Sequence, residues 1–342
     1  MELLCKEGMS QDSPLKMKKA IKEIRRDSRR YNWTDDTIET LPSEWQWRLC
    51  TARLQLGVMD WRGWQWRNSR QGMDPFDIPK WDLGLPIYPA VPELREPAPV
   101  DNLLVYSEQG IGDQIMFAQG LRYVLPYAKE VTLEIEPRLA PAFERAFPEI
   151  RVHPLKDLRD SSWVKAGEFD AKALMGDVVA RFVRNPDKLL KGPYLSPDPE
   201  KVAYWKTWLS QYERPWVGFS WVGRQGYIPP AIGTGWVDLQ YGDYESEGLI
   251  QPPIDKKEDI EDIFAITSLM DKVVCVPNTL AHIAGSLGVP TDVISVLGTG
   301  QVHNGVNWRW GMPGDRKMKW HPSIKVYRSV KEWGQINLPG KS

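Results

Sequence analysis

The sequence predicts an α/β protein with two Rossmann-like domains behind a short helical N-terminal segment. From residue 96 onward, short apolar runs alternate with helical patterns, as is typical of parallel βαβ units. A second series of the same kind begins after residue 200, and 342 residues suit about two domains at roughly 150 residues each. We therefore expect the helical segment at residues 1–95, the first Rossmann-like domain at 96–200 and the second at 201–342.

The N-terminal segment shows helical periodicity. Residues 43–70 carry apolar side chains at three- and four-residue steps, which predicts a helical hairpin. Residues 16–30 are rich in lysine and arginine, and a solvated helix face is favoured there over a phosphate-binding one. Five prolines between Pro86 and Pro99 exclude a helix or a central strand, so this stretch marks the first domain boundary.

Two βα series follow the proline-rich stretch. The first predicts strands at 102–106, 131–136 and 151–154, with helices at 114–128 and 138–146. The second predicts strands at 216–221, 237–240, 273–276 and 292–297, with helices at 259–270 and 279–287. Ligands of such sheets bind outside the carboxyl ends of the strands, so the loops that follow these strands are the expected site.

The composition excludes several classes of protein. Lys plus Arg is 44 and Asp plus Glu is 45, a net charge of −1 without the basic excess of proteins that bind nucleic-acid backbone. Three cysteines far apart exclude a disulfide framework and a zinc ribbon. The chain has no apolar run near the ~18 residues of a membrane span and no apolar signal core, so we expect a cytoplasmic protein. With 17 Trp against 8 Phe, some indoles are candidates for a binding surface.

The loop SEQGIGD at residues 107–113 joins the first predicted strand to its helix. Gly110 and Gly112 allow the backbone to approach a ligand closely, and the helix start behind them favours negative charge. The loop is not a dinucleotide-binding fingerprint, because Ile115 stands where the third glycine would be.

The polar residues of this loop have two interpretations each. Asp113 is either the N-cap of the following helix or a general base at the mouth of a cleft. Glu108 is either a solvated carboxylate or, with Gln109, part of a ligand-binding loop.

A second motif, PNTLAHIAGSLG at residues 277–288, follows the strand VVCV. Asn278 and Thr279 are natural caps at the helix entrance that also offer donors to a phosphate. His282 lies one turn further and is either a packed histidine or a further donor. Gly285 allows this helix to pack closely against a neighbouring element.

Three more segments are candidates for binding. Arg224, in the turn GFSWVGRQG, is either a phosphate clamp or an exposed loop arginine. The strings NWRWG at residues 307–311 and KWHPS at 319–323 are rich in indole, which either packs against sugars and bases or closes a core.

These motifs together resemble a known family. The matching stretches are DWRGWQWR, FDIPKWDLGLP, YSEQGIGDQIMFAQGLRYV, VDLQYGD and DIEDIFAITSLMDKVVCVPNTLAHIAGSLGVPT, followed by NWRWG and WHPSIKVYR. The sequence resembles bacterial and phage proteins that join a degenerate tetratricopeptide segment to a glycosyltransferase domain like the lipopolysaccharide heptosyltransferases. The likeness extends over residues 60–328, with much of the middle unmatched.

The resemblance implies a GT-B arrangement, in which two Rossmann-like domains face each other across a cleft. It implies an inverting transfer from a nucleotide sugar, without a cofactor or an obligatory metal. Residues 96–200 would then bind the acceptor, with Asp113 as the base, and residues 201–342 would bind the nucleotide sugar. The family's donor-phosphate contacts correspond to Asn278, Thr279 and His282.

The chain also departs from the family. Pro277 replaces an aspartate, and the segment 223–237 is shorter and lacks the usual basic residues. These departures favour an inactive sugar-nucleotide or glycan-binding protein of the same fold, whereas the intact GIGD and His282 favour an enzyme. An interaction scaffold built on the N-terminal helices would explain the tryptophans there but not the glycines at the strand ends. The sequence leaves open the donor, the oligomeric state and the acceptor, which could be a glycan, a protein or a modified DNA base.

Overall fold

The computed structural model describes most of the chain from residue 95 to residue 337 and parts of the segment before it. The described residues are 76–83, 95–157, 160–223, 226–227, 234–242, 244, 248–295, 308–311 and 316–337, with isolated positions between Gln46 and Trp64. The basic stretch 16–30, most of the predicted helical hairpin and Arg224 lie outside the described residues.

The first half of the fold is a parallel sheet with the strand order β3-β2-β1-β4. Its strands are β1 (Val100–Tyr106), β2 (Ala128–Ile135), β3 (Arg151–Pro154) and β4 (Ala171–Leu174). Leu103 lies opposite Val131 on one side and Ala171 on the other. The last four residues of β1 are buried, as expected for a strand covered on both faces.

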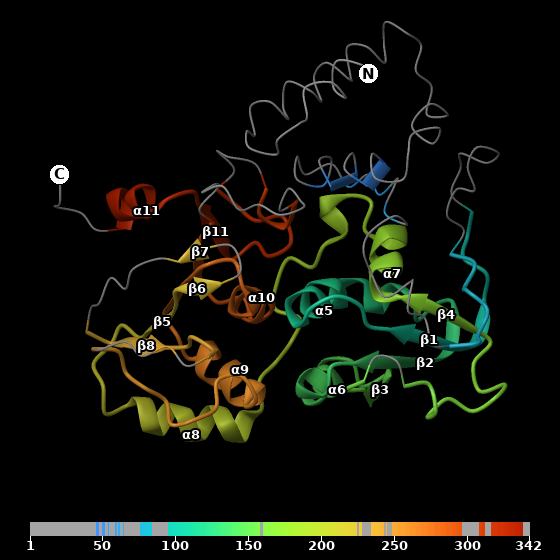
Figure 1. The fold of residues 1–342 in the computed structure, drawn as a ribbon, viewed down its shortest axis with the longest axis horizontal. Helices are drawn as coiled ribbons and strands as arrows, with labels where there is room; N and C mark the ends of the chain where they lie inside the picture. The colour runs from blue at the N-terminus through green and yellow to red at the C-terminus, as the bar shows by residue number, and fades with distance from the viewer. Residues whose placement is uncertain are drawn as a thin grey trace, which may run out of the picture.

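Helices connect these strands and cover the sheet. They are α5 (Ile111–Phe117), η3 (Ala118–Tyr123), η4 (Pro137–Leu139), α6 (Ala140–Ala146), α7 (Met175–Phe182) and η5 (Pro186–Lys188). In Figure 1, α7 and α6 lie on opposite sides of this sheet.

The second half is a parallel sheet with the strand order β11-β10-β9-β5-β8. Its strands are β5 (Val217–Ser220), β8 (Trp236–Asp238), β9 (Lys272–Cys275), β10 (Thr291–Ile294) and β11 (Ile324–Tyr327). A short antiparallel pair, β6 (Val222–Gly223) and β7 (Gly226–Tyr227), follows β5. The helices are α8 (Pro199–Leu209), α9 (Ile260–Ser268), α10 (Thr279–Ser286), η6 (Trp308–Trp310) and α11 (Val330–Asn337).

The predicted α/β class and the two parallel sheets are therefore confirmed, with differences in detail. The helix expected at 114–128 begins earlier, at Ile111, and continues as the 3₁₀ helix η3. The pairs β4–α7 and β11–α11 were not predicted. β4 has only four residues and includes Lys172, which is buried because its ammonium group donates to the Phe76 carbonyl. A charged residue inside a short strand removes the apolar run that identifies a buried strand.

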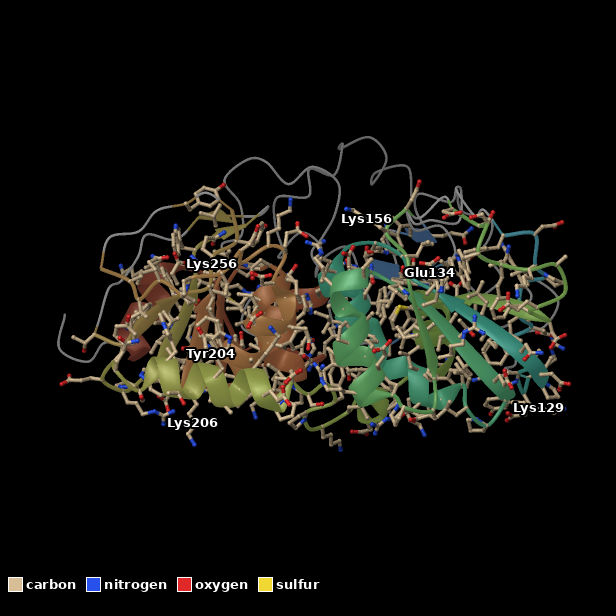
Figure 2. All side chains as sticks on the ribbon, turned by 90° about the horizontal axis from the view of Figure 1, so that it is seen from below. Lys129, Glu134, Lys156, Tyr204, Lys206 and Lys256 are labelled. Atoms are coloured by element: carbon tan, nitrogen blue, oxygen red, sulfur yellow. The ribbon has the colours of Figure 1, made fainter. Side chains whose placement is uncertain are left out.

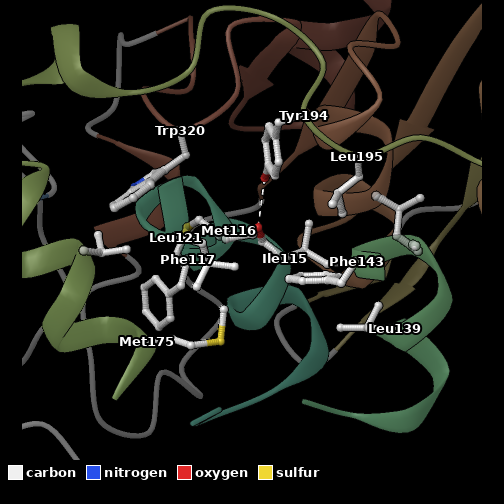
Figure 3. Close-up of a cluster of buried hydrophobic side chains, with 14 of the residues drawn as sticks. Ile115, Met116, Phe117, Leu121, Leu139, Phe143, Met175, Tyr194, Leu195 and Trp320 are labelled. Carbon is white, nitrogen blue, oxygen red and sulfur yellow. Dashed lines mark hydrogen bonds between the residues drawn. The ribbon is translucent and has the colours of Figure 1, made fainter. Parts of the chain in front are cut away.

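The two halves lie side by side, with α5 of the first packed against α10 of the second (Figure 1). Lys129 marks the outer end of the first sheet, and the exposed Tyr204 lies on the outer surface of α8 (Figure 2). Tyr194 lies in the connection between the halves and donates its hydroxyl hydrogen to the Ile115 carbonyl at 3.0 Å (Figure 3). Gln119 Nε2 donates to the Trp320 carbonyl at 2.9 Å. These contacts hold α5 and η3 against the connection and the second half. The domain boundaries and the cleft stay predictions.

The indoles of the described residues mainly close the core. Trp61 and Trp64 meet edge to face, with ring centroids 4.8 Å apart, and both also meet Trp308 of the second half. Trp61 Nε1 donates to the Val183 carbonyl of the first half at 2.7 Å. Trp308 and Trp320 are buried, so core packing, rather than contact with sugars or bases, is the interpretation that holds for the indoles of NWRWG and KWHPS.

Candidate functional site

Two strand-to-helix connections meet where the halves touch. The strand order reverses between β1 and β4 in the first sheet and between β5 and β9 in the second. Such reversal points, at the carboxyl ends of the strands, are where doubly wound sheets bind ligands. The loop after β1 leads into α5, and the loop after β9 leads into α10. Because α5 and α10 pack together, side chains from both helix starts can act on one ligand.

The loop after β1 forms a tight entrance to α5. Gln109 has a positive φ of 62°, and the Gly110 carbonyl accepts the amide hydrogens of Asp113 and Gln114 at 3.0 and 3.1 Å. Gly110 is thus the N-cap residue, and Asp113 lies within the first turn without capping it. The capping interpretation of Asp113 is therefore wrong, and its carboxylate has another partner.

That partner is Arg309 in η6. Arg309 Nε donates to Asp113 Oδ1 at 2.6 Å, and Nη2 lies 2.5 Å from the same oxygen and donates to Gln109 Oε1 at 3.0 Å. The guanidinium also lies over the Trp308 ring, with Arg309 Cζ 4.6 Å from the ring centroid. The two charged side chains keep only 22% and 16% of their surface exposed, so the pair joins the two halves in a largely solvent-shielded position.

Glu108 differs from its expected role as a solvated carboxylate or a ligand contact. Its side chain is fully buried, and Oε1 accepts the amide hydrogen of Gly176 at 3.0 Å, near the start of α7. A Cβ atom on Gly176 would lie 2.3 Å from that oxygen, so the glycine is needed for this approach. Glu108 thus links the ends of β1 and β4 and helps to hold the loop after β1 in place.

Asn278 stands before α10 without capping it. Its Nδ2 donates to Ser220 Oγ at 2.7 Å, and that hydroxyl donates to Gln240 Oε1 at 2.8 Å. Gln240 Oε1 also accepts the backbone amide hydrogens of Trp221 and Val222. These bonds fix the orientation of the Gln240 amide and, through Ser220, that of the Asn278 side chain. Asn278 Oδ1 is left buried without a hydrogen-bond partner among the described residues. The first amides of α10 are therefore not capped by this side chain, and uncapped helix starts are where anions commonly bind.

His282 is buried between the two helix starts. A Cβ atom on Gly112 would lie 2.8 Å from His282 Cδ2, so α5 approaches the imidazole through this glycine. Burial, together with the nearby Arg309 guanidinium, lowers the pKa of His282 to about 3. His282 is therefore neutral near pH 7 and offers a hydrogen bond rather than a positive charge.

A second histidine, His321, lies behind His282. The two rings approach to 3.2 Å between His282 Nδ1 and His321 Nε2. A Cβ atom on Gly285 would lie 2.4 Å from His321 Cγ, so the close packing expected of Gly285 is made against this ring. Burial, with His282 alongside, lowers the pKa of His321 well below its ordinary value.

The structure thus brings together Gln109, Gly112, Asp113 and His282 from the sequence prediction and adds Arg309 and His321. Thr279 lies half-buried at the start of α10, and Gly110 is exposed at the start of α5. The strings NWRWG and KWHPS were singled out for their indoles, and the arginine and histidine inside them are the residues that reach this junction.

Within the described ranges, no group of three or more His, Cys, Asp or Glu side chains is placed to hold a metal ion. Over the same part of the chain, none of the helices has both the length and the apolar character required to cross a membrane.

Comparisons with known proteins give distant similarities. No family model matches the chain. Protein FlbA of Caulobacter vibrioides is 27% identical over 321 residues, covering 82% of this chain and 51% of that protein, so the chain spans about half the length of this curated relative.

Among solved structures, ADP-heptose lipopolysaccharide heptosyltransferase II of E. coli is 13% identical, with a TM-score of 0.44 over 69% of this chain and 94% of that one. A glycosyl transferase family 9 protein from Veillonella parvula is 13% identical, with a TM-score of 0.45 over 69% and 88%. The iron-containing dodecameric glycosyltransferase TibC of enterotoxigenic E. coli is 12% identical, with a TM-score of 0.38 over 62% and 63%.

Proposed function

We propose that this chain is an inverting glycosyltransferase that moves a sugar from a nucleotide-sugar donor to an acceptor hydroxyl. The observation that carries the proposal is the meeting of the two helix starts. A carboxylate, Asp113, lies one residue after Gly112, the glycine of α5 that packs against His282, and the Asn278 side chain does not cap the start of α10. Glycosyl transfer needs a base for the acceptor and donors for the leaving diphosphate, and this junction offers both.

In the proposed reaction the acceptor oxygen attacks the anomeric carbon from the face opposite the diphosphate. The new glycosidic bond forms, the bond from carbon to phosphate oxygen breaks, and the nucleoside diphosphate leaves with that electron pair. Asp113 takes the acceptor proton. The amides at the start of α10, with Thr279, and the His282 N–H group stabilise the charge that develops on the diphosphate.

Arg309 adds a step to this mechanism. Its ion pair with Asp113 occupies the carboxylate that must accept the proton. A diphosphate carries more negative charge than a carboxylate and matches the guanidinium fork equally well, so a bound donor competes for Arg309. Donor binding would then release Asp113 to act as a base, and Arg309 would serve as the cation that the sequence assigned to Arg224.

The test combines sugar transfer with donor binding. A screen of nucleotide sugars should identify a donor from which the purified protein releases a nucleoside diphosphate. Asp113→Asn should lower transfer by roughly a hundredfold or more, because the amide cannot accept a proton, while calorimetry should show that the donor still binds. Asp101→Asn is the matched control: Asp101 pairs with Lys129 at 2.8 Å at the outer end of the sheet, and this change should leave transfer unaffected. Equal turnover of Asp113→Asn and the parent protein would refute Asp113 as the base.

The same ion pair favours a second candidate, a sugar-nucleotide-binding protein without turnover. If Arg309 stays on Asp113 when the nucleotide is bound, the carboxylate cannot act as a base. Tight binding of a nucleotide sugar, with no transfer to any acceptor and no hydrolysis, would favour this candidate over the enzyme.

A further inference from the structure

His282 presents two different edges to its surroundings. Nδ1 lies 3.2 Å from His321 Nε2, at the rear of the site. The opposite edge runs from Cδ2 to Nε2, and Gly112 lies against its Cδ2 end, where an added Cβ would lie 2.8 Å from Cδ2, 3.5 Å from Cγ and 3.6 Å from Nε2. This second edge therefore lies beside the start of α5, which carries Asp113. The proton can reside on either nitrogen, and its position decides whether that edge donates or accepts a hydrogen bond.

The His321 ring is held firmly behind His282. It is fully buried in the connection before β11, and Gly285 leaves room for no more than the ring. The Tyr194 ring stacks on it with centroids 6.1 Å apart and an interplanar angle of 9°. His321 Nδ1 is buried with no hydrogen-bond partner among the described residues.

The unpartnered nitrogen distinguishes the two arrangements of the shared proton. If His282 Nδ1 donated, the His321 proton would be on its own Nδ1, a buried N–H group without an acceptor. If His321 Nε2 donates, its Nδ1 carries only a lone pair. Buried N–H groups without an acceptor are rarer in proteins than acceptors without a donor, so the second arrangement is favoured.

We infer that His321 is a positioning residue that holds His282 as the neutral tautomer with its proton on Nε2, as a hydrogen-bond donor facing the start of α5. The expected ligand atom is an oxygen, and under the proposed function, on which this last step rests, it is an oxygen of the donor diphosphate. The Arg309 guanidinium, which is paired with Asp113, lies near enough to His282 to act on its pKa. A neutral donor adds a directed hydrogen bond there without placing a second positive charge beside the guanidinium. The low pKa of both imidazoles agrees with the absence of a charged ring.

The first experiment needs no ligand. Nitrogen-15 spectra of the histidine-labelled full chain report which ring nitrogen carries the proton, and His282→Gln identifies the His282 signals by their loss. At about pH 7, His282 should show a protonated Nε2 and an unprotonated, hydrogen-bonded Nδ1. In His321→Phe the two His282 tautomers should mix, whereas in His321→Gln the side-chain amide can donate to Nδ1 and should restore a single tautomer. A His282 proton found on Nδ1 in the parent protein would overturn the inference.

The second experiment measures binding of adenosine and uridine diphosphates by calorimetry. His321→Phe should weaken binding by about tenfold, the loss of one oriented hydrogen bond, and His321→Gln should recover most of it. His153→Gln, far from this junction, is the control and should bind like the parent. Binding unaffected by His321→Phe would overturn the positioning role.

The two experiments separate the inference from the proposed function. If the spectra give the expected tautomer and neither diphosphate binds, the donor site is refuted while the tautomer assignment is supported. If His321→Phe does not fold, the spectrum of the parent protein and the behaviour of His321→Gln still decide the assignment.

Discussion

Mild acid should destabilise this protein, because His282 and His321 are buried as neutral rings. In the unfolded chain a histidine has a pKa of 6.5, whereas burial lowers that of His282 to about 3 and that of His321 well below the ordinary value. Below pH 6.5 the unfolded chain therefore binds protons that the folded protein does not. The stabilisation is complete above the unfolded pKa and is lost as the pH falls.

The magnitude follows from the shift in pKa. Between about pH 7 and about pH 5.5, the proton uptake of one such histidine on unfolding rises from about a quarter to about nine-tenths of a proton, which lowers the free energy of unfolding by about 1.3 kcal/mol. The pair together should account for about 2.5 kcal/mol. Carboxylates with lowered pKa, such as Asp198 and Glu168, change the stability at lower pH, so this window isolates the histidines.

The assay is urea unfolding at the two pH values, in the parent protein and in the double variant His282→Gln, His321→Gln. The parent should lose stability on acidification, and the double variant should lose much less. His153 is half-buried, and burial and Arg151 lower its pKa. It therefore makes the same, smaller contribution to the loss of stability in both proteins. A parent protein equally stable at both pH values would refute the description of these rings as buried and neutral.

Two further outcomes are expected. Gly285→Ala should lower the free energy of unfolding by about 1–3 kcal/mol, because the new methyl group would lie 2.4 Å from His321 Cγ. Gly192→Ala, whose methyl group would meet nothing within 4 Å, is the matched control, and equal effects of the two would contradict this packing. Sugar transfer should persist in excess chelator, because the converging groups offer one carboxylate, paired with Arg309, rather than the several oxygens that magnesium or manganese prefers. Complete loss of transfer in EDTA, restored by manganese, would contradict that expectation.

The sequence by itself determined the local structure around the site. Apolar runs predicted β1, β2 and β9 close to their observed positions, because a strand buried on both faces needs a continuous apolar stretch. The Asn-Thr pair predicted the start of α10, since short polar residues favour helix entrances. Both loops that approach the site were therefore identifiable before any tertiary contact was known.

Only the tertiary structure decided which side chains meet there. Arg309 reaches Asp113 across 196 residues of sequence, and His321 reaches His282 across 39. No local sequence pattern predicts either contact, because each depends on how α5, α10 and the connection before β11 pack together. The same holds for Glu108, which the sequence left as either solvated or part of a ligand-binding loop and which is buried because Gly176, near the start of α7, leaves room for its carboxylate. Backbone periodicity is set by neighbours along the chain, whereas the partner and the charge state of a buried polar group are set by whatever packs around it.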